Sequence, residues 1–169
     1  MTSSPLAFGP SQLVSFTVYG KPQQKGSKRV FPVKGRLPDG SPRQDYVVRD
    51  ANPNARPWAA AISAQAAEVM ETHRLVRGPV GVDLDFYFAR PKSHYGTGRN
   101  ATKLKPSAPE EMITTPDVDK LARCALDALT GVVIADDAQI ADLAVRKRYG
   151  EPERVEVVVL VFADERETT

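Results

Sequence analysis

The chain has little of the chemistry that sulfur and imidazole supply. Its single cysteine, Cys124, cannot form an internal disulfide, which is typical of proteins that work in a reducing cytoplasm. Its two histidines, His73 and His94, are isolated, which excludes a structural zinc site of Cys and His ligands. The sequence also lacks the apolar run of about eighteen residues that a membrane span needs, and residues 1–10 lack the features of a signal peptide. We therefore expect a cytoplasmic protein that spans no membrane.

A chain of 169 residues fits one compact domain with an apolar core. Residues 1–12, rich in Ser, Pro and Gly, predict a disordered leader, and residues 164–169 predict a flexible tail. The folded domain should span residues 13–163, with basic loops at 20–45 and 90–114. The expected fold class is α/β of the α+β kind, with one mixed β-sheet and two main helices packed on one side of it.

Charged residues are unevenly distributed, although the formal net charge is only +2. Residues 1–50 contain eight Lys or Arg against three Asp or Glu, and residues 90–105 contain five bases and no acid. Residues 106–137 instead contain seven acids against two bases. An acidic centre between two basic segments suits a protein that holds a polyanion with its basic parts and a metal ion with its acidic part.

Alternation and helical spacing predict the regular elements. In chain order these are a strand at 13–19, a short ribbon of 29–33 with 45–49, a helix from Asn54 to about His73, a strand at 80–88, a helix at 116–129 followed by Gly131, and a closing hairpin of 139–149 with 154–162. The loop at 90–114 is long for a compact domain, and loops of that length are usually functional.

The second expected helix begins with two carboxylates. On a helical wheel Asp119 and Arg123 lie opposite the apolar stripe, with Asp117 at its flank. Capping alone is one explanation, because Thr115 is a good N-cap, Pro116 is a good first helical residue, and acids favour the first turn.

A second acidic pair, Asp136 and Asp137, follows seventeen to twenty residues later. Alone it would most often mark a turn. If the chain doubles back, this pair meets Asp117 and Asp119, and carboxylates that close repel unless a cation neutralises them. Hard oxygen ligands select Mg²⁺, with Mn²⁺ as the expected substitute. The four carboxylates therefore predict a metal site that activates a water for phosphodiester hydrolysis.

The segment Asp117–Leu121, its continuation Ala125–Thr130, and the segment Asp136–Ile140 resemble the RusA family of Holliday-junction resolvases. The similarity extends to Val18–Pro22, Arg90–Lys92 and Lys147. The resemblance implies a small, dimeric, Mg²⁺-dependent endonuclease with a mixed α/β fold, encoded mostly by phages and prophages.

By this resemblance, Asp117, Asp119 and Asp137 fall on the catalytic carboxylates of the family, and Asp136 is the adjacent acid of the metal site. Arg123 stands where the family typically has a catalytically important lysine. An arginine keeps the positive charge beside the scissile phosphate, but it cannot plausibly give up a proton. Proton transfer, if the reaction needs it here, would fall to another residue such as Lys120.

Basic side chains on both sides of the acidic centre are expected to contact DNA phosphates, which positions the nucleic acid without reading its sequence. The expected contacts are Lys21, Lys25, Lys28, Arg29, Lys92, Lys120 and Lys147. For any one of these residues, a solvated surface position is the plain alternative.

These observations predict a homodimeric endodeoxyribonuclease that cuts branched DNA in the cytoplasm, that of a bacterial host if a phage encodes it. Two nicks on opposed strands need two sites, and one chain offers one acidic cluster. A DNA-binding protein without catalysis would keep the basic loops but would not need four clustered acids. A metal-dependent nucleotidyl- or glycosyltransferase also uses an Asp-x-Asp pair, but no glycine-rich phosphate loop supports that alternative.

Overall fold

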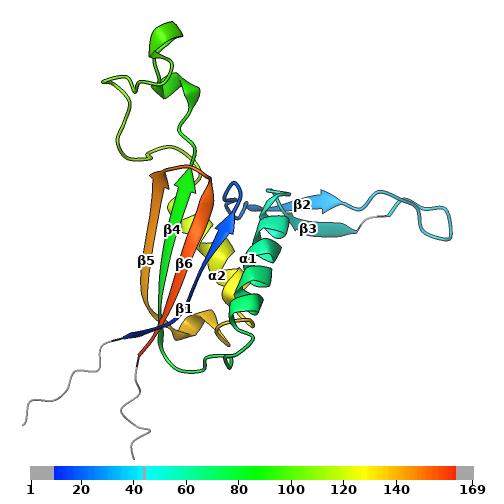
Figure 1. Cartoon of the computed structure of the whole chain (residues 1–169). Helices are drawn as coiled ribbons and strands as arrows, with labels where there is room; N and C mark the ends of the chain where they lie inside the picture. Colours follow the sequence, from blue (N-terminus) through cyan, green and yellow to red (C-terminus); the bar gives the residue numbers. More distant parts are fainter. Residues whose placement is uncertain (1–9, 44, 163–169) are drawn as a thin grey trace, which may run out of the picture.

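The computed structural model describes residues 10–43 and 45–162. One four-stranded sheet forms its centre, with the strands in the order β1-β6-β4-β5 (Figure 1). The strands are β1 (Ser11–Tyr19), β4 (Val80–Phe88), β5 (Ile140–Tyr149) and β6 (Arg154–Val161). β6 runs antiparallel to both neighbours, whereas β4 and β5 are parallel, so the sheet is mixed, as predicted.

The predicted closing hairpin of residues 139–149 and 154–162 does not form. Both strands exist, but β5 pairs with β4, and β6 lies between β1 and β4. The connection from β4 to β5 contains a helix, and a helical crossover returns the chain parallel to the strand that it left. β6 carries Val155, Val157 and Val159 on the buried face, and its other face has Val158 and Leu160 beside Arg154 and Glu156. The continuous apolar run Val157–Val161 suits a central strand.

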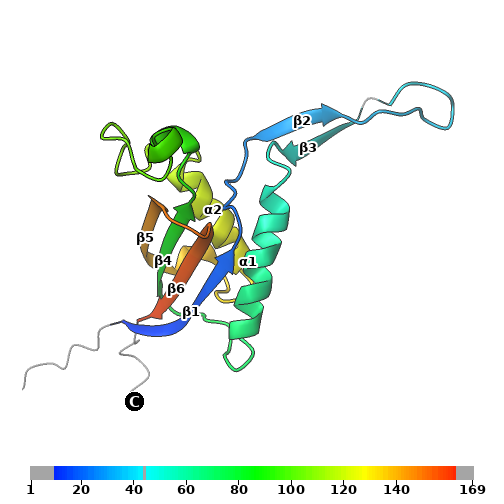
Figure 2. The ribbon, with the colours of Figure 1, turned by 45° about the horizontal axis from the view of Figure 1, so that its top comes forward.

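Two helices cover one face of the sheet, as predicted (Figures 1 and 2). α1 (Ala55–Val69) buries Trp58, Ile62 and Ala66. It starts after Asn54, as expected, but the Asn54 side chain makes no capping hydrogen bond, and the helix ends before the predicted end near His73.

α2 (Val118–Leu129) packs beside α1 and starts later than predicted. Asp117, in extended conformation, is its N-cap residue, so the predicted cap at Thr115 is wrong. Its inner face is buried, and the residues concerned are Leu121, Ala122, Cys124, Ala125, Ala128 and Leu129. Gly131 follows the helix with a φ of 80°, the left-handed conformation expected there.

A two-stranded arm, here called the ribbon (residues 26–50), projects from the body beside α1 (Figures 1 and 2). It pairs β2 (Lys28–Pro32) with β3 (Tyr46–Asp50), close to the predicted bounds. Arg29 lies directly opposite Arg49 in this pairing. Like charges facing each other across two strands are unfavourable unless an anion lies between them.

A second arm, here called the finger (residues 90–114), extends beyond the ends of β4 and β5 at which the arrows point (Figure 1). It contains the short 3₁₀-helices η1 (Lys92–His94) and η2 (Gly98–Asn100). The Arg90 guanidinium closes its base by donating hydrogen bonds of 2.7 and 3.1 Å to the carbonyl oxygens of Pro109 and Glu110.

β1 begins at Ser11, so the ordered strand starts before the predicted limit of the leader at residue 12. Residues 1–9 of the predicted leader and the predicted tail at 164–169 lie outside the described residues. Of the helices described, none combines the length and apolar character needed to traverse a membrane.

Candidate active site

The first acidic pair lies at the N-terminus of α2. The backbone N–H of Asp117 donates a 2.7 Å hydrogen bond to Gln24 Oε1, and its carboxylate accepts one of 2.6 Å from Lys120 Nζ. Asp119, in the first turn, is exposed, and its carboxylate has no hydrogen-bond partner among the described residues. The fold therefore holds Asp117 in place and leaves Asp119 open to a ligand.

Lys120 stabilises the ionised form of Asp117. Its hydrogen bond and its positive charge lower the pKa of the Asp117 carboxyl below the usual value of 3.8, and the charge of Lys147 adds to this. The same contact raises the pKa of Lys120 above 10.5. Both groups are ionised at neutral pH. Lys120, a predicted DNA contact, is thus an ion-pair partner of Asp117.

Lys147 connects the end of β5 to the segment that precedes α2. Its ammonium group donates hydrogen bonds to the carbonyl oxygens of Thr114 and Pro116, at 2.6 and 2.9 Å. These bonds fix the backbone on which Asp117 sits. Lys147 was predicted to contact DNA, and the structure gives it this positioning role.

Arg123 lies one turn after Asp119 on the exposed face of α2. A plain i, i+4 ion pair with Asp127 does not form, because Asp127 pairs with Lys25 instead. Within the described part of the chain Arg123 has no ion-pair partner. It lines a groove of about 520 Å³ at the base of the ribbon, together with Lys25, Gly26, Ser27, Lys28, Val48, Arg49, Asp50 and Asp127. The Arg123 guanidinium is therefore available to a phosphate.

The second acidic pair precedes β5, on the 3₁₀-helix η3 (Asp137–Gln139). Asp136 caps this helix: its carboxylate accepts from the N–H of Ala138 (2.9 Å), and its own N–H donates to Gln139 Oε1 (2.8 Å). Asp137 is exposed and has no side-chain partner among the described residues. A role in the turn thus explains Asp136, whereas the carboxylate of Asp137 is open to a ligand.

The two acidic pairs do not meet within one chain. Asp117 lies near Lys147, towards the end of β5, while Asp137 lies before its first residue, Ile140. Seven residues of strand at about 3.3 Å each separate Ile140 from Lys147, on the order of 20 Å. In the described residues, no three His, Cys, Asp or Glu side chains are grouped to hold one metal ion. The expected meeting of the two pairs is wrong. The chain reverses only around Asp137, and β5 then runs back alongside α2 in the opposite direction, so the two pairs lie at opposite ends of β5 (Figure 1).

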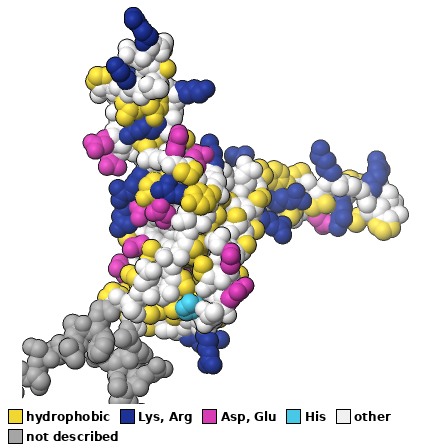
Figure 3. All heavy atoms as spheres, viewed as in Figure 1, with side chains coloured by type: hydrophobic (Ala, Val, Ile, Leu, Met, Phe, Trp, Pro, Cys, Tyr) yellow, Lys and Arg dark blue, Asp and Glu magenta, His cyan; other side chains and the backbone are white. Residues whose placement is uncertain are grey.

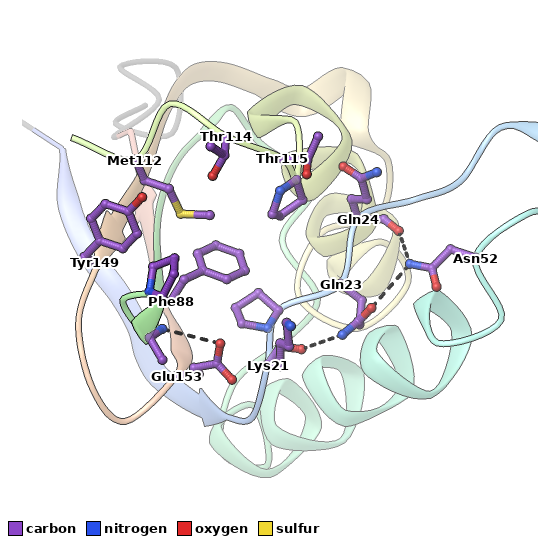
Figure 4. Close-up of a pocket in the computed structure, with 14 residues that line it drawn as sticks. Lys21, Gln23, Gln24, Asn52, Phe88, Met112, Thr114, Thr115, Tyr149 and Glu153 are labelled. Carbon is purple, nitrogen blue, oxygen red and sulfur yellow. Dashed lines mark hydrogen bonds between the residues drawn. The ribbon is translucent and has the colours of Figure 1, made fainter. Parts of the chain in front are cut away.

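A cavity of about 410 Å³ opens beside the start of α2 (Figure 4). Figure 4 shows Phe88, Met112 and Tyr149 on one side of it and amide side chains on the other. Its lining residues are Lys21, Pro22, Gln23, Gln24, Asn52, Phe88, Ala89, Pro91, Met112, Thr114, Thr115, Pro116, Tyr149 and Glu153. Polar and apolar groups contribute about equally to its walls, so the cavity offers both packing and hydrogen-bonding surfaces to a ligand.

The basic residues predicted to contact DNA surround this end of the molecule. Lys28 and Arg29 lie on the ribbon, Lys92 on the finger, and Lys21 on the rim of the cavity. Figure 3 shows Lys and Arg side chains along both arms. Lys25 lies at the ribbon base, where its charge is already paired with Asp127.

Comparison with known proteins decides the family. The model of the family described as Endodeoxyribonuclease RusA matches residues 37–160. The chain belongs to the RusA endodeoxyribonuclease family. It is also 33% identical over 152 residues to a protein of Bacillus subtilis (strain 168) named Uncharacterized protein YqaN, a match that covers 86% of this chain and 94% of that protein. The resemblance inferred from Asp117–Leu121 and Asp136–Ile140 is confirmed.

Sequence reasoning missed two features of this RusA-family site. Gln24 accepts the N–H of Asp117, and Asn52 in turn donates to the carbonyl oxygen of Gln24 (2.8 Å). Neither amide belongs to a motif, so no local signal pointed to them. The only hint was that Lys21 and Lys25, which flank Gln24, were expected to face DNA.

Proposed function

We propose that this RusA-family endodeoxyribonuclease cuts branched DNA, Holliday junctions above all, as a metal-dependent homodimer. The observation that supports this most directly is the position of the two acidic pairs, which lie at opposite ends of β5, an edge strand of the sheet. One copy alone offers Asp119 at one end and Asp137 at the other.

A two-fold pairing of β5 with the β5 of a second copy would bring these ends together. Antiparallel strands place the start of one strand beside the end of the other, and a two-fold axis repeats the same contact on both copies. A register centred on Ala144 would set Asp142 opposite Arg146 of the second copy, and Leu143 opposite its Val145. Opposite charges and apolar pairs across two strands are both stabilising.

The carboxylates fit a magnesium ion. Mg²⁺ is commonly held by one or two carboxylates together with waters and substrate phosphates, and Asp117 and Asp119 at the start of α2 supply that minimum. Asp137 of the second copy would complete the set. Mn²⁺ is expected to substitute. When bound, the ion supplies an activated water and stabilises negative charge on the phosphate.

The residues of the chain itself would position the substrate. Arg123 places a permanent charge beside the phosphate that is cut, a task that requires no proton transfer. Lys147 and Gln24 hold the backbone of Asp117 in place. The ribbon and the finger present Lys28, Arg29 and Lys92 to the phosphates of the flanking DNA arms.

Mixing two inactive variants tests the proposal. Asp119→Asn and Asp137→Asn proteins are each expected to lack Mg²⁺-dependent cleavage of four-way junctions. A mixed dimer pairs one copy of each variant. If each site takes Asp119 from one copy and Asp137 from the other, one of its two sites has both wild-type acids. We expect the mixture to regain nicking of one strand. No recovery after verified subunit exchange would contradict the shared site, and no cleavage by the wild-type protein with Mg²⁺ or Mn²⁺ would contradict the nuclease function.

A further inference from the structure

The cavity beside α2 combines two kinds of wall. One side carries the rings of Phe88 and Tyr149 and the thioether of Met112 (Figure 4). A volume of about 410 Å³ lies within the usual range for small-ligand pockets, roughly 300–1,000 Å³, and accommodates one nucleoside. Apolar and aromatic walls of this kind suit the flat face of a nucleobase.

The opposite side offers hydrogen-bonding groups that suit the edge of a base. Gln23 and Asn52 form a connected pair, with Asn52 Nδ2 lying 3.4 Å from Gln23 Oε1. Glu153 adds a carboxylate on the Phe88 side of the cavity, where it accepts a 3.4 Å hydrogen bond from the N–H of Ala89 (Figure 4). A carboxylate accepts from the exocyclic amino group of a base, and it repels a phosphate.

The cavity is also coupled directly to the acidic pair. Pro116, which lines it, is the residue before Asp117, and Gln24, which also lines it, holds the Asp117 N–H. Lys21 at the rim supplies a positive charge for the backbone phosphate next to an inserted base. A strand whose phosphate lies at Asp117 therefore has a neighbouring nucleotide within reach of the cavity.

We propose that this cavity takes one unstacked nucleobase of the strand being cut, a base that carries an exocyclic amino group, and so sets the preferred cleavage position. The inference rests on the proposed nuclease function. Drawing a base out of the stack costs least where pairing or stacking is already disturbed, and the branch point is the place where a junction departs from a regular duplex.

Cleavage mapping tests the specificity. Junctions that differ only in the base next to the cut are digested by the wild-type homodimer with Mg²⁺. Cleavage beside thymine or beside an abasic residue is expected to be about 10-fold slower than beside an amino-bearing base, the discrimination typical of a good base contact. Glu153→Gln should reduce this preference. Glu151→Gln is the matched control, because Glu151 lies in the same turn but outside the cavity.

Fluorescence of 2-aminopurine tests insertion without cleavage. The analogue is placed at successive positions near the branch point and the wild-type protein is added in EDTA. We expect the signal to change strongly at one position adjacent to the cut, and Thr114→Trp, which fills the cavity, to abolish the change. Ser15→Trp on β1, at an exposed position away from the cavity, should leave it intact.

The outcomes separate this inference from the nuclease proposal. Base-independent cleavage with no local 2-aminopurine signal would overturn the base site and leave the nuclease function standing. Absence of cleavage would overturn the nuclease function, while the fluorescence would still decide on insertion. Inhibition by free deoxycytidine monophosphate, with no effect of the abasic residue, would mean that the cavity binds a free nucleotide and would equally overturn the proposal.

Discussion

The two acidic pairs of the chain are built alike, although they lie at opposite ends of β5. In each pair the fold engages the first acid and leaves the second free. Asp117 is bound by Lys120, and Asp136 caps η3, whereas Asp119 and Asp137 have no side-chain partner among the described residues. The comparison teaches that neighbouring carboxylates reach a ligand on different terms: the first member already has a contact within the protein and would share its carboxylate, whereas the second is open to a ligand.

The largest expected effect is that of Asp119→Asn. We expect the rate of junction cleavage to fall by at least about 100-fold, because a free carboxylate of the metal site is lost. DNA binding should be retained or improved, since one negative charge facing the DNA is removed. Nuclease assays and gel shifts in EDTA measure the two effects. Binding lost together with cleavage would argue against a metal role for Asp119.

Substitutions in the second pair should distinguish the structural role of Asp136 from the metal-binding role proposed for Asp137. Asp137→Asn is expected to abolish cleavage with the melting temperature unchanged. Asp136→Asn should keep both stability and most of the activity, because asparagine caps a helix as well as aspartate does. Asp136→Ala should instead lower the free energy of unfolding by about 0.5–2 kcal/mol. Equal loss of cleavage in both asparagine variants would mean that Asp136 also binds the metal.

Removal of Lys147 should disturb the first pair indirectly. Lys147→Met loses two charge-assisted hydrogen bonds to the backbone before α2, each contributing roughly 1.5–3 kcal/mol at most. We expect both the stability in urea and the cleavage rate to fall, with Lys147→Arg recovering part of each. A cleavage defect with unchanged stability would indicate a direct DNA contact instead.

The smallest effect concerns Arg123 and tests what its charge does. Arg123→Lys should change the cleavage rate by no more than a few-fold, while Arg123→Ala should lower it by about 10–100-fold, because the task is electrostatic. Rate measurements across pH 6–9 provide the check. A large gain on restoring lysine would show that the reaction had lacked a proton donor.

The pH dependence of the Asp117–Lys120 ion pair provides a further test of the first acidic pair. Lys120 lowers the pKa of Asp117, so the stabilisation from their ion pair is present above the usual value of 3.8 and is lost as the pH falls through the lowered value. Lys120→Met should raise the pKa of the Asp117 carboxyl towards 3.8. An NMR titration of that carboxyl measures the change.

The sequence predicted the local features well. Alternation located β4, and helical spacing located both helices. The predicted left-handed glycine after α2, Gly131, was also correct. These properties depend on residues close together in the chain. The resemblance carried by Asp117–Leu121 identified the family.

Long-range features were not accessible in the same way. The hairpin of β5 with β6 and the return of Asp137 to Asp117 both depend on strand order, which no local pattern encodes. The Gln24 contact to Asp117 joins residues 93 positions apart. The apolar character of β6 alone does not predict the strands with which it pairs.

The position of β5 at the edge of the sheet has a consequence for enzyme dosage. If each site needs acids from two copies, the population of complete sites grows with the square of the protein concentration when dimers are scarce. Specific activity should then collapse on dilution, and cleavage would begin abruptly once synthesis carried the protein past its dissociation constant. Dimerisation through the edge strand would in this way make activity depend on protein concentration, and the enzyme would stay inactive until enough copies had accumulated.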